Sequence, residues 1–440
     1  MSITVRLHAS EGSPSGGARP TAPITGGGFG PPGMLMRRDV ERHADILRQH
    51  LGWRFARIDL GSCATGELDV LADVAQLLHG IGMAPWLTAQ IDAHLSPTDF
   101  AARLTEAVRG LSGRVPSAGG APMRIEVVLP ADGELGHALR CYDAVVAAVK
   151  LHDPAIEVGG PCTSDPQRLD AFLGHVYHRP PPADVDHPSS ASRCDFVSVR
   201  AEGLRVEPLA AARALVNVTL PGEAGRRVPV VCSWFDRSTS RCDAERDTAV
   251  HAAAVARFLL EAAPLCVEAA PAGASDILDQ SGIGGPGLCY TPFHGGPGVL
   301  TVHDLPKPMF HAFDWLRRLG EGAAVPLEVA PATPGLTVSA SRVRNTLRLL
   351  VAYEAPSDRS DLALRLAGWP GSTAEVSRVS AKHGSALARW RALGSPDFLN
   401  DDLLSELTAS SLPGAASVWL ATEALAVEPG SLTWIEAQAA

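Results

Sequence analysis

Strand and helix signals alternate along most of this chain, and this alternation is the feature that most restricts its fold. Short apolar runs typical of buried strands separate longer segments whose apolar residues follow helical spacing. The strand-like runs lie at 55–60, 84–87, 124–129, 156–160, 196–199, 228–232 and from 266. Helical patterns fill the segments between them, ending with 309–319. Repeated β-α units predict a parallel sheet covered by helices, and about eight of them favour a closed (β/α)8 TIM barrel.

The pattern changes beyond residue 325. Short apolar segments at 336–340, 346–351 and 362–366 are separated by turn residues, which predicts an antiparallel β-sandwich. The alternating run at 3–7 is a candidate strand of that sandwich, and the Gly-, Pro- and Ser-rich stretch up to about residue 33 is expected to be a loop. We therefore expect an N-terminal strand within 1–15, a (β/α)8 barrel within 16–325 and a C-terminal β-sandwich domain within 326–440.

Composition excludes several classes of function. The 440 residues carry a net charge of −10 without a basic block, which argues against a nucleic-acid partner and against an anionic membrane surface. No apolar run of about 20 residues predicts a membrane span, and the N-terminal residues lack a secretory pattern. The eight cysteines have no C-x-x-C spacing, so we expect free thiols and a cytoplasmic location. A small-molecule substrate is expected, no metal or organic cofactor is implied, and the oligomeric state is left open.

Several segments resemble glycoside hydrolase family 39, which contains β-xylosidases and α-L-iduronidases. Phe293–Gly296 (FHGG), followed by Gly298–Leu300 and Lys307-Pro308, is similar to the last barrel segment of that family. Further similar segments are IEVGGPC at 156–162, DFVS at 195–198 and the stretch from Ala381 to Pro396. The resemblance implies a barrel with a β-sandwich, and a hydrolytic site with one glutamate as acid/base and a second as nucleophile.

The residues at those two active-site positions depart from the family pattern. Pro130 stands where the family places its acid/base glutamate, and Ser233 stands where it places its nucleophile. Arg200 replaces a histidine of the family, and 271–276 lacks the family's aromatic residues. Retaining hydrolysis needs two carboxyl groups about 5–5.5 Å apart, and neither proline nor serine supplies one. The resemblance therefore predicts that the usual mechanism is lost, unless acids close in sequence replace the glutamates.

Two acidic stretches offer replacements at strand ends, where TIM-barrel enzymes carry their catalytic groups. Asp132 and Glu134 follow Pro130 directly and are catalytic candidates; the alternative is a solvated turn with a helix cap. Asp236 is a candidate nucleophile, or else a surface partner of Arg237.

Other residues at strand ends are candidates for contact with a substrate. Arg200 and Glu202 leave one strand on the same face, and they form either an anion clamp or an ion pair with each other. The remaining candidates are Asp59, Gln90, Ser233, Trp234, Asp276 and His294. A role in loop structure is the more usual one for His294.

Three functions fit these residues. The favoured hypothesis is an enzyme that has left hydrolysis for dehydration, elimination, isomerisation or cyclisation of a small oxygenated metabolite, as in antibiotic or other natural-product biosynthesis, since such reactions need one acid and one base. The second is a glycoside hydrolase with relocated carboxylates that acts on a xyloside- or uronide-like substrate. The third is a catalytically silent binding protein, a pseudoglycosidase.

Overall fold

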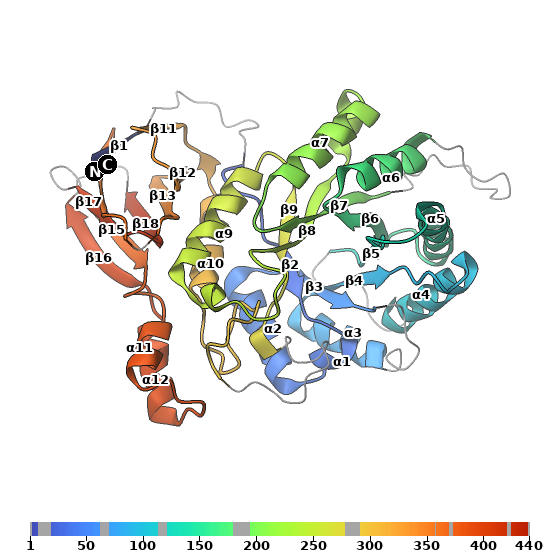
Figure 1. Cartoon of the computed structure of the whole chain (residues 1–440), viewed down its shortest axis with the longest axis horizontal. Coiled ribbons are helices and arrows are strands. Elements are labelled where there is room, and N and C mark those ends of the chain that lie inside the picture. Colours follow the sequence, from blue (N-terminus) through green and yellow to red (C-terminus); the bar gives the residue numbers. More distant parts are fainter. Residues whose placement is uncertain are drawn as a thin grey trace.

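The computed structural model describes residues 2–7, 19–61, 70–112, 121–178, 194–277, 291–356, 358–368, 373–419 and 424–438. Eight parallel strands follow one another in chain order around a barrel (Figure 1). They are β2 (Gly26–Gly28), β3 (Phe55–Asp59), β4 (Ala84–Gln90), β5 (Arg124–Val128), β6 (Glu157–Thr163), β7 (Phe196–Glu202), β8 (Val230–Asp236) and β9 (Glu268–Pro271). The segment before β2 meets β9, because Ile24 bridges Ala269 in parallel. The predicted TIM barrel is confirmed.

Helices cover the outside of the barrel (Figure 1). α2 shows why: its buried Val40, Ala44, Leu47 and Leu51 recur at helical spacing, and Gly52 ends it in the left-handed conformation. The other helices are α1 (Pro32–Leu35), α3 (Leu71–Ile81), α4 (Pro97–Ser112), α5 (Leu135–His152), α6 (Pro166–His178), α7 (Glu207–Thr219), α8 (Glu223–Arg227), the 3-10 turn η3 (Ala244–Asp247), α9 (Ala249–Ala262) and α10 (Pro308–Gly320).

The first barrel strand lies inside the glycine-rich stretch that we expected to be a loop. Gly26 to Gly28 pair in register with residues 55 to 57 of β3. A Cβ atom on Gly26 would lie 2.3 Å from the carbonyl oxygen of Phe55, and one on Gly27 would lie 2.6 Å from Cη2 of Trp53. These glycines are therefore needed for close packing, which composition alone does not distinguish from loop flexibility.

Aromatic side chains close the N-terminal end of the barrel interior. Phe55, Trp86 and Phe196 pack edge to face around the guanidinium of Arg124, which lies 4.2 Å from the centroid of Phe55. Arg124 also pairs with Glu157 and Glu268. Because this end is filled, a substrate site of the usual kind has to lie at the C-terminal ends of the strands, the mouth of the barrel.

Two further sheets form the second domain, which lies beside the barrel (Figure 1). One contains β11 (Leu327–Ala330), β1 (Ser2–Leu7), β14 (Leu362–Ala367) and β17 (Leu425–Val427); the other contains β10 (Ala323–Ala324), β12 (Leu336–Val343), β13 (Thr346–Tyr353), β18 (Ser431–Gln438), β15 (Thr373–Val379) and β16 (Gly414–Trp419). Pairing is antiparallel as predicted, apart from β1 and β14, which run parallel. α11 (Leu387–Ala392) and α12 (Asp401–Ser410) extend from this domain.

The barrel and the six-stranded sheet share one apolar core. Trp315 of α10 stacks on Trp434 of β18 with ring centroids 6.2 Å apart, and the guanidinium of Arg318 lies over the same indole ring. Over the described parts of the chain, no helix has the length and apolarity that a membrane crossing requires. Six cysteines within the described ranges are free thiols.

One buried histidine makes the stability of this core depend on pH. His251 on α9 is 2% exposed, and burial, with help from Lys307, Arg237 and Arg246, lowers its pKa to about 3. An unfolded histidine titrates near pH 6.5. Since the folded pKa lies below the unfolded one, the stability that the neutral imidazole contributes is complete above about pH 6.5. It is lost as the pH falls towards 3.

We expect His251→Met to reduce the acid sensitivity of folding. The loss of unfolding free energy between pH 7 and pH 5 should be about 2 kcal/mol smaller in this variant than in the parent chain. Urea unfolding at both pH values measures the difference, with the exposed His94→Met as the matched control. An equal loss in the parent chain and His251→Met would show that His251 is not buried as a neutral ring.

Candidate functional site

The two positions at which the family resemblance expects glutamates carry no acid. Ser233 on β8 is fully buried, and its Oγ donates to Sγ of Cys162 at 3.4 Å. Pro130 lies two residues beyond β5, and its carbonyl oxygen accepts a hydrogen bond of 2.6 Å from Arg168. At neither position can the side chain donate a proton to a leaving group or form a glycosyl ester.

Asp132 and Glu134 lie in the exposed turn between β5 and α5. Glu134 occupies the N-cap position of α5, but its side chain makes no capping hydrogen bond and lies 3.6 Å from a guanidinium nitrogen of Arg140. The side chain of Asp132 has no hydrogen-bond or ion-pair partner among the described residues. Asp132 is therefore an exposed acid beyond the end of β5 without a partner among the described residues.

Asp236, at the end of β8, is held in a buried ion pair. Nε and Nη2 of Arg246 donate to its two carboxylate oxygens at 3.1 and 2.9 Å. The partner is thus Arg246, while Arg237 pairs with Glu245. Burial raises the pKa of Asp236, and the charge of Arg246 opposes that shift. The guanidinium also donates to the carbonyl groups of residues 238, 241 and 295, so the pair fixes loops around the mouth.

A second buried cluster supports the FHGG segment. Nζ of Lys307 lies 3.1 Å from Asp276 and 2.7 Å from Asp247, and all three side chains are almost fully buried. Desolvation raises the pKa of Asp276, whereas desolvation of Lys307 is outweighed by the two carboxylates, which raise its pKa. Asp276 also accepts from the backbone N–H of Gly298 at 2.8 Å, so it holds the loop that carries His294.

Arg200, Glu202 and Trp234 form a half-exposed group at the ends of β7 and β8. Nε of Arg200 lies 2.9 Å from a carboxylate oxygen of Glu202, and its guanidinium stacks 4.0 Å from the centroid of Trp234. The arginine is thereby fixed in one orientation at the mouth. Two of the remaining candidates, Asp59 and Gln90, are exposed at the ends of β3 and β4, where Asp59 accepts from the backbone of Gly61.

Sequence reasoning missed a charged pair inside the barrel. Nη2 of Arg57 lies 3.1 Å from Oε2 of the fully buried Glu126, and Oε1 of this carboxylate has no partner among the described residues. Cys162 lies between this pair and Ser233, 3.9 Å from the guanidinium, and burial raises its pKa to about 12. The signal available in the sequence was one charged residue within each of two apolar strands.

The described residues include no cluster of three or more His, Cys, Asp or Glu side chains arranged to hold a metal ion. Every acid at the mouth other than Asp132 that is discussed above has a cationic or backbone partner. The arrangement can thus supply one free carboxyl group and one fixed guanidinium, but it does not present two free, facing carboxylates.

Arg246→Met should destabilise the fold strongly, because it leaves the carboxylate of Asp236 buried without its partner. We expect a loss of about 3–5 kcal/mol of unfolding free energy. Arg237→Met, which removes only the more exposed pair with Glu245, should cost less than about 1 kcal/mol. Denaturant unfolding compares the two variants. Similar small losses of unfolding free energy in both would mean that the ion pair of Asp236 with Arg246 does not stabilise the fold.

Comparisons with known proteins point to one glycosidase family. The family model described as Glycosyl hydrolases family 39 matches residues 131–423. A β-xylosidase of Caldicellulosiruptor saccharolyticus is 23% identical over 306 residues, which cover 63% of this chain and 57% of that protein. A β-xylosidase of Geobacillus stearothermophilus is 28% identical over 196 residues, which cover 41% of this chain and 37% of that protein. These matches span little more than half the length of the curated relatives, or less.

Solved structures show the same fold over the whole length. A family 39 β-xylosidase from Caulobacter crescentus has a TM-score of 0.76 at 21% identity and covers 99% of both chains. A family 39 enzyme from Xanthomonas axonopodis pv. citri has a TM-score of 0.77 at 17% identity and covers 99% of this chain and 97% of that one. Since the family model spans well over half of the sequence, this chain belongs to glycosyl hydrolase family 39.

Proposed function

We propose that this chain binds a glycoside of the xyloside class across the mouth of the barrel and cleaves it with Asp132 as the single acid. The observation that carries the substrate class is membership of family 39, in which the two curated relatives are β-xylosidases. This is a form of the second function that the sequence suggests, a glycoside hydrolase with relocated carboxylates, in which water takes the place of Asp236 as nucleophile. It takes precedence over non-hydrolytic chemistry because both relatives are β-xylosidases.

Asp132 is proposed as the acid because its carboxyl group has no ion-pair partner among the described residues. Glu134, in the same turn, lies next to Arg140, and Asp236 is bound to Arg246. Asp132 has no such partner and follows the strand end at which the family resemblance expects the acid/base. A positioned general acid contributes about 10²–10⁴-fold to the rate of a reaction in which a leaving group must be protonated.

The nucleophile in this proposal is water. Ser233 is buried, its hydroxyl group donates to Sγ of Cys162, and no base contacts it among the described residues, so we do not assign it as the nucleophile. Without an enzyme nucleophile there is no covalent glycosyl intermediate, and a single displacement by water inverts the anomeric configuration. Asp132 gives its proton to the leaving group, and the proton that the attacking water loses passes to solvent, because the acids discussed above other than Asp132 all have partners. Retention of configuration would therefore contradict the proposed route.

A second candidate is favoured by the group formed by Arg200, Glu202 and Trp234. Its guanidinium is held by stacking and by an ion pair beside the strand that carries Ser233. A fixed positive charge there suits a reaction that develops negative charge on its substrate, such as elimination of water or isomerisation of a small oxygenated metabolite. Asp132 would then act as the acid in that reaction.

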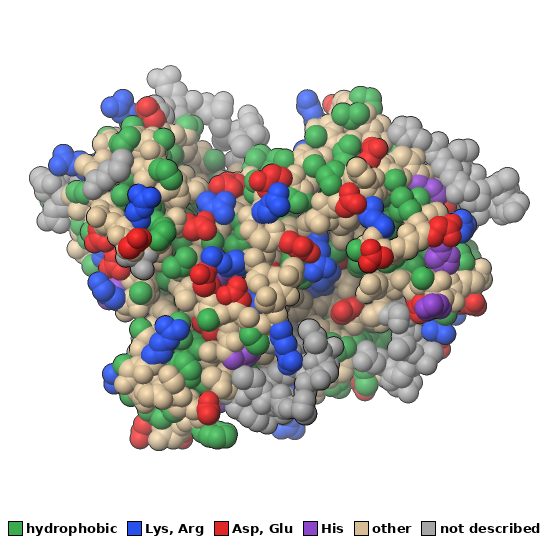
Figure 2. Space-filling model, in the orientation of Figure 1, with side chains coloured by type: hydrophobic (Ala, Val, Ile, Leu, Met, Phe, Trp, Pro, Cys, Tyr) green, Lys and Arg blue, Asp and Glu red, His purple; other side chains and the backbone are tan. Residues whose placement is uncertain are grey.

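The charge distribution fits a small neutral or acidic ligand better than a polyanion. Acidic and basic side chains are interspersed over the face seen in Figure 2, and the chain carries a net charge of −10. Binding to a nucleic acid usually needs a basic patch or stripe. A small-molecule substrate remains the proposed partner.

Asp132→Asn is the variant that tests the proposed acid. With xylobiose, whose sugar leaving group must be protonated, we expect it to lower xylose release by about 10²-fold or more, since the amide cannot donate the required proton. 4-Nitrophenyl β-xyloside, α-iduronide and related aryl glycosides, whose leaving group departs as an anion, should be affected less. Glu134→Gln, an equally exposed change two residues away, should stay within about twofold of the parent chain. Release of xylose or nitrophenol measures the rate, and proton NMR of the first product gives its configuration.

The same assay separates the candidates. If turnover falls in Glu134→Gln but not in Asp132→Asn, the acid is Glu134 and the assignment of Asp132 is wrong. Glycoside binding without turnover would remove the hydrolytic proposal, and incubation with sugar acids and other polyols would then be followed by mass spectrometry for a product lighter by one water. Absence of both binding and turnover with every glycoside would overturn the proposed substrate class.

A further inference from the structure

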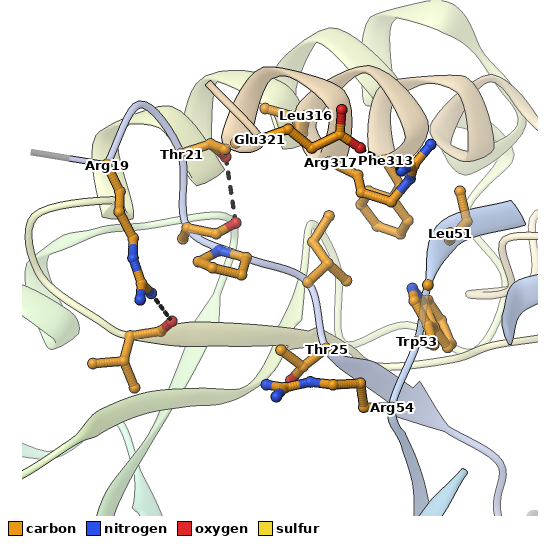
Figure 3. Close-up of a pocket in the computed structure, with 16 residues that line it drawn as sticks. Arg19, Thr21, Thr25, Leu51, Trp53, Arg54, Phe313, Leu316, Arg317 and Glu321 are labelled. Carbon is orange, nitrogen blue, oxygen red and sulfur yellow. Dashed lines mark hydrogen bonds and ion pairs between the residues drawn. The ribbon is translucent and has the colours of Figure 1, made fainter. Parts of the chain in front are cut away.

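A cavity lies at the opposite end of the barrel from the mouth. Figure 3 shows its lining residues. It has a volume of about 420 Å³, within the range typical of small-molecule pockets. Its lining includes Thr25, Arg54 and Val267, which directly precede β2, β3 and β9, so it is bounded by the N-terminal ends of these strands. The last turns of α10 form another wall. Nothing in the proposed chemistry at the mouth uses this cavity.

The walls are largely apolar and include two aromatic rings. Trp53 and Phe313, with centroids 6.5 Å apart, line the cavity together with Ile24, Leu51 and Leu316. Figure 3 shows Trp53 and Arg54 on one side of the cavity and Arg19 on the other. A ligand that enters here would bury an apolar body of roughly the size of a bicyclic ring against these side chains.

The indole N–H of Trp53 is a buried donor without an acceptor. The side chain is fully buried, and Nε1 has no hydrogen-bond partner among the described residues. The six-membered end of the ring is fixed against Gly27, where a Cβ atom would lie only 2.6 Å from Cη2. The five-membered end, which carries the N–H, is therefore held away from that contact. Buried donors are nearly always paired, so this one points to a missing acceptor.

Three arginines and one glutamate supply the charge of the lining. Arg19 donates to the carbonyl oxygen of Val267 at 3.3 Å and has no acidic partner among the described residues. Arg54 lies 3.6 Å from Glu268, a carboxylate already bonded to Arg124 and Thr25.

Near α10, the charges are already balanced. Arg317 pairs with Asp314 and Glu321, and Glu321 also pairs with Arg348. The cavity thus presents donors of the exposed Arg19 and Arg54 together with the indole N–H of Trp53, and of these three groups the indole N–H is the one buried without an acceptor.

We propose that this cavity binds a small organic carboxylate with a flat apolar body. The carboxylate would accept hydrogen bonds from Arg54 and from the indole N–H of Trp53 on one side of the cavity, and Arg19 on the other side would add a positive charge. The body would lie against the side chains of Ile24, Leu51 and Leu316, beside the packed rings of Trp53 and Phe313. Such a ligand would connect residues 19–25, which lead into the first barrel strand, to α10 on the opposite wall.

Titration calorimetry on the full chain with 2-naphthoate tests this site, with 2-naphthalenemethanol as the uncharged analogue of equal shape. We expect one molecule of 2-naphthoate to bind per chain. The alcohol should bind at least about tenfold more weakly, because it loses the charge-assisted hydrogen bonds to arginine. Arg19→Gln should weaken the binding of 2-naphthoate by about fivefold or more, and it should leave folding unchanged because Arg19 is exposed.

Arg227→Gln is the matched control, an exposed arginine on α8 outside the cavity, and it should leave binding unchanged. Trp53→Phe adds a second readout, since it removes the N–H and keeps an aromatic ring. It should weaken the binding of 2-naphthoate more than the binding of 2-naphthalenemethanol. The proposal is overturned if 2-naphthoate does not bind, if the alcohol binds equally well, or if Arg19→Gln and Arg227→Gln behave alike.

Discussion

Closure of the barrel through three glycines is the constraint on which the rest of the structure depends. β2 is short and has no side chains, so the backbone of Gly27 can lie against the indole of Trp53 while Gly26 approaches the carbonyl of Phe55. Ile24 then reaches Ala269 and completes the ring. Because all eight strands are parallel, closure brings their C-terminal ends together at one mouth, and it fixes the cavity beside Trp53 at the other end.

Ion pairing decides which acids at the mouth remain available. Asp236 pairs with the buried Arg246, and Asp276 pairs with the buried Lys307. Both ion pairs hold loops against the barrel. Breaking such a pair is costly, since the remaining charge would be buried alone. These acids stabilise the mouth, while Asp132, the proposed acid, lies in an exposed turn without a partner among the described residues. The scaffold of a glycosidase is thus retained with a different set of chemical groups.

The sequence was sufficient to predict the barrel and the C-terminal sheets, because alternation of apolar strands and amphipathic helices depends only on local spacing. It was insufficient for β2, whose glycines are typical of a loop in composition. The pair of Arg57 and Glu126 is separated by 69 residues, and the choice of Arg246 over Arg237 as partner of Asp236 depends on how a loop folds back. Contacts of this kind follow from tertiary packing and leave no periodic signal.

The central claim is that glycoside chemistry at this mouth does not pass through a covalent glycosyl-enzyme. Intact-protein mass spectrometry after incubation with an activated 2-deoxy-2-fluoro-xyloside, which accumulates such an intermediate in retaining glycosidases, tests it most directly. The buried Ser233 and its contact with Cys162 predict an unchanged mass. A mass increased by one fluorosugar, located by peptide mapping to the end of β8, would contradict the account and show that a nucleophile operates there.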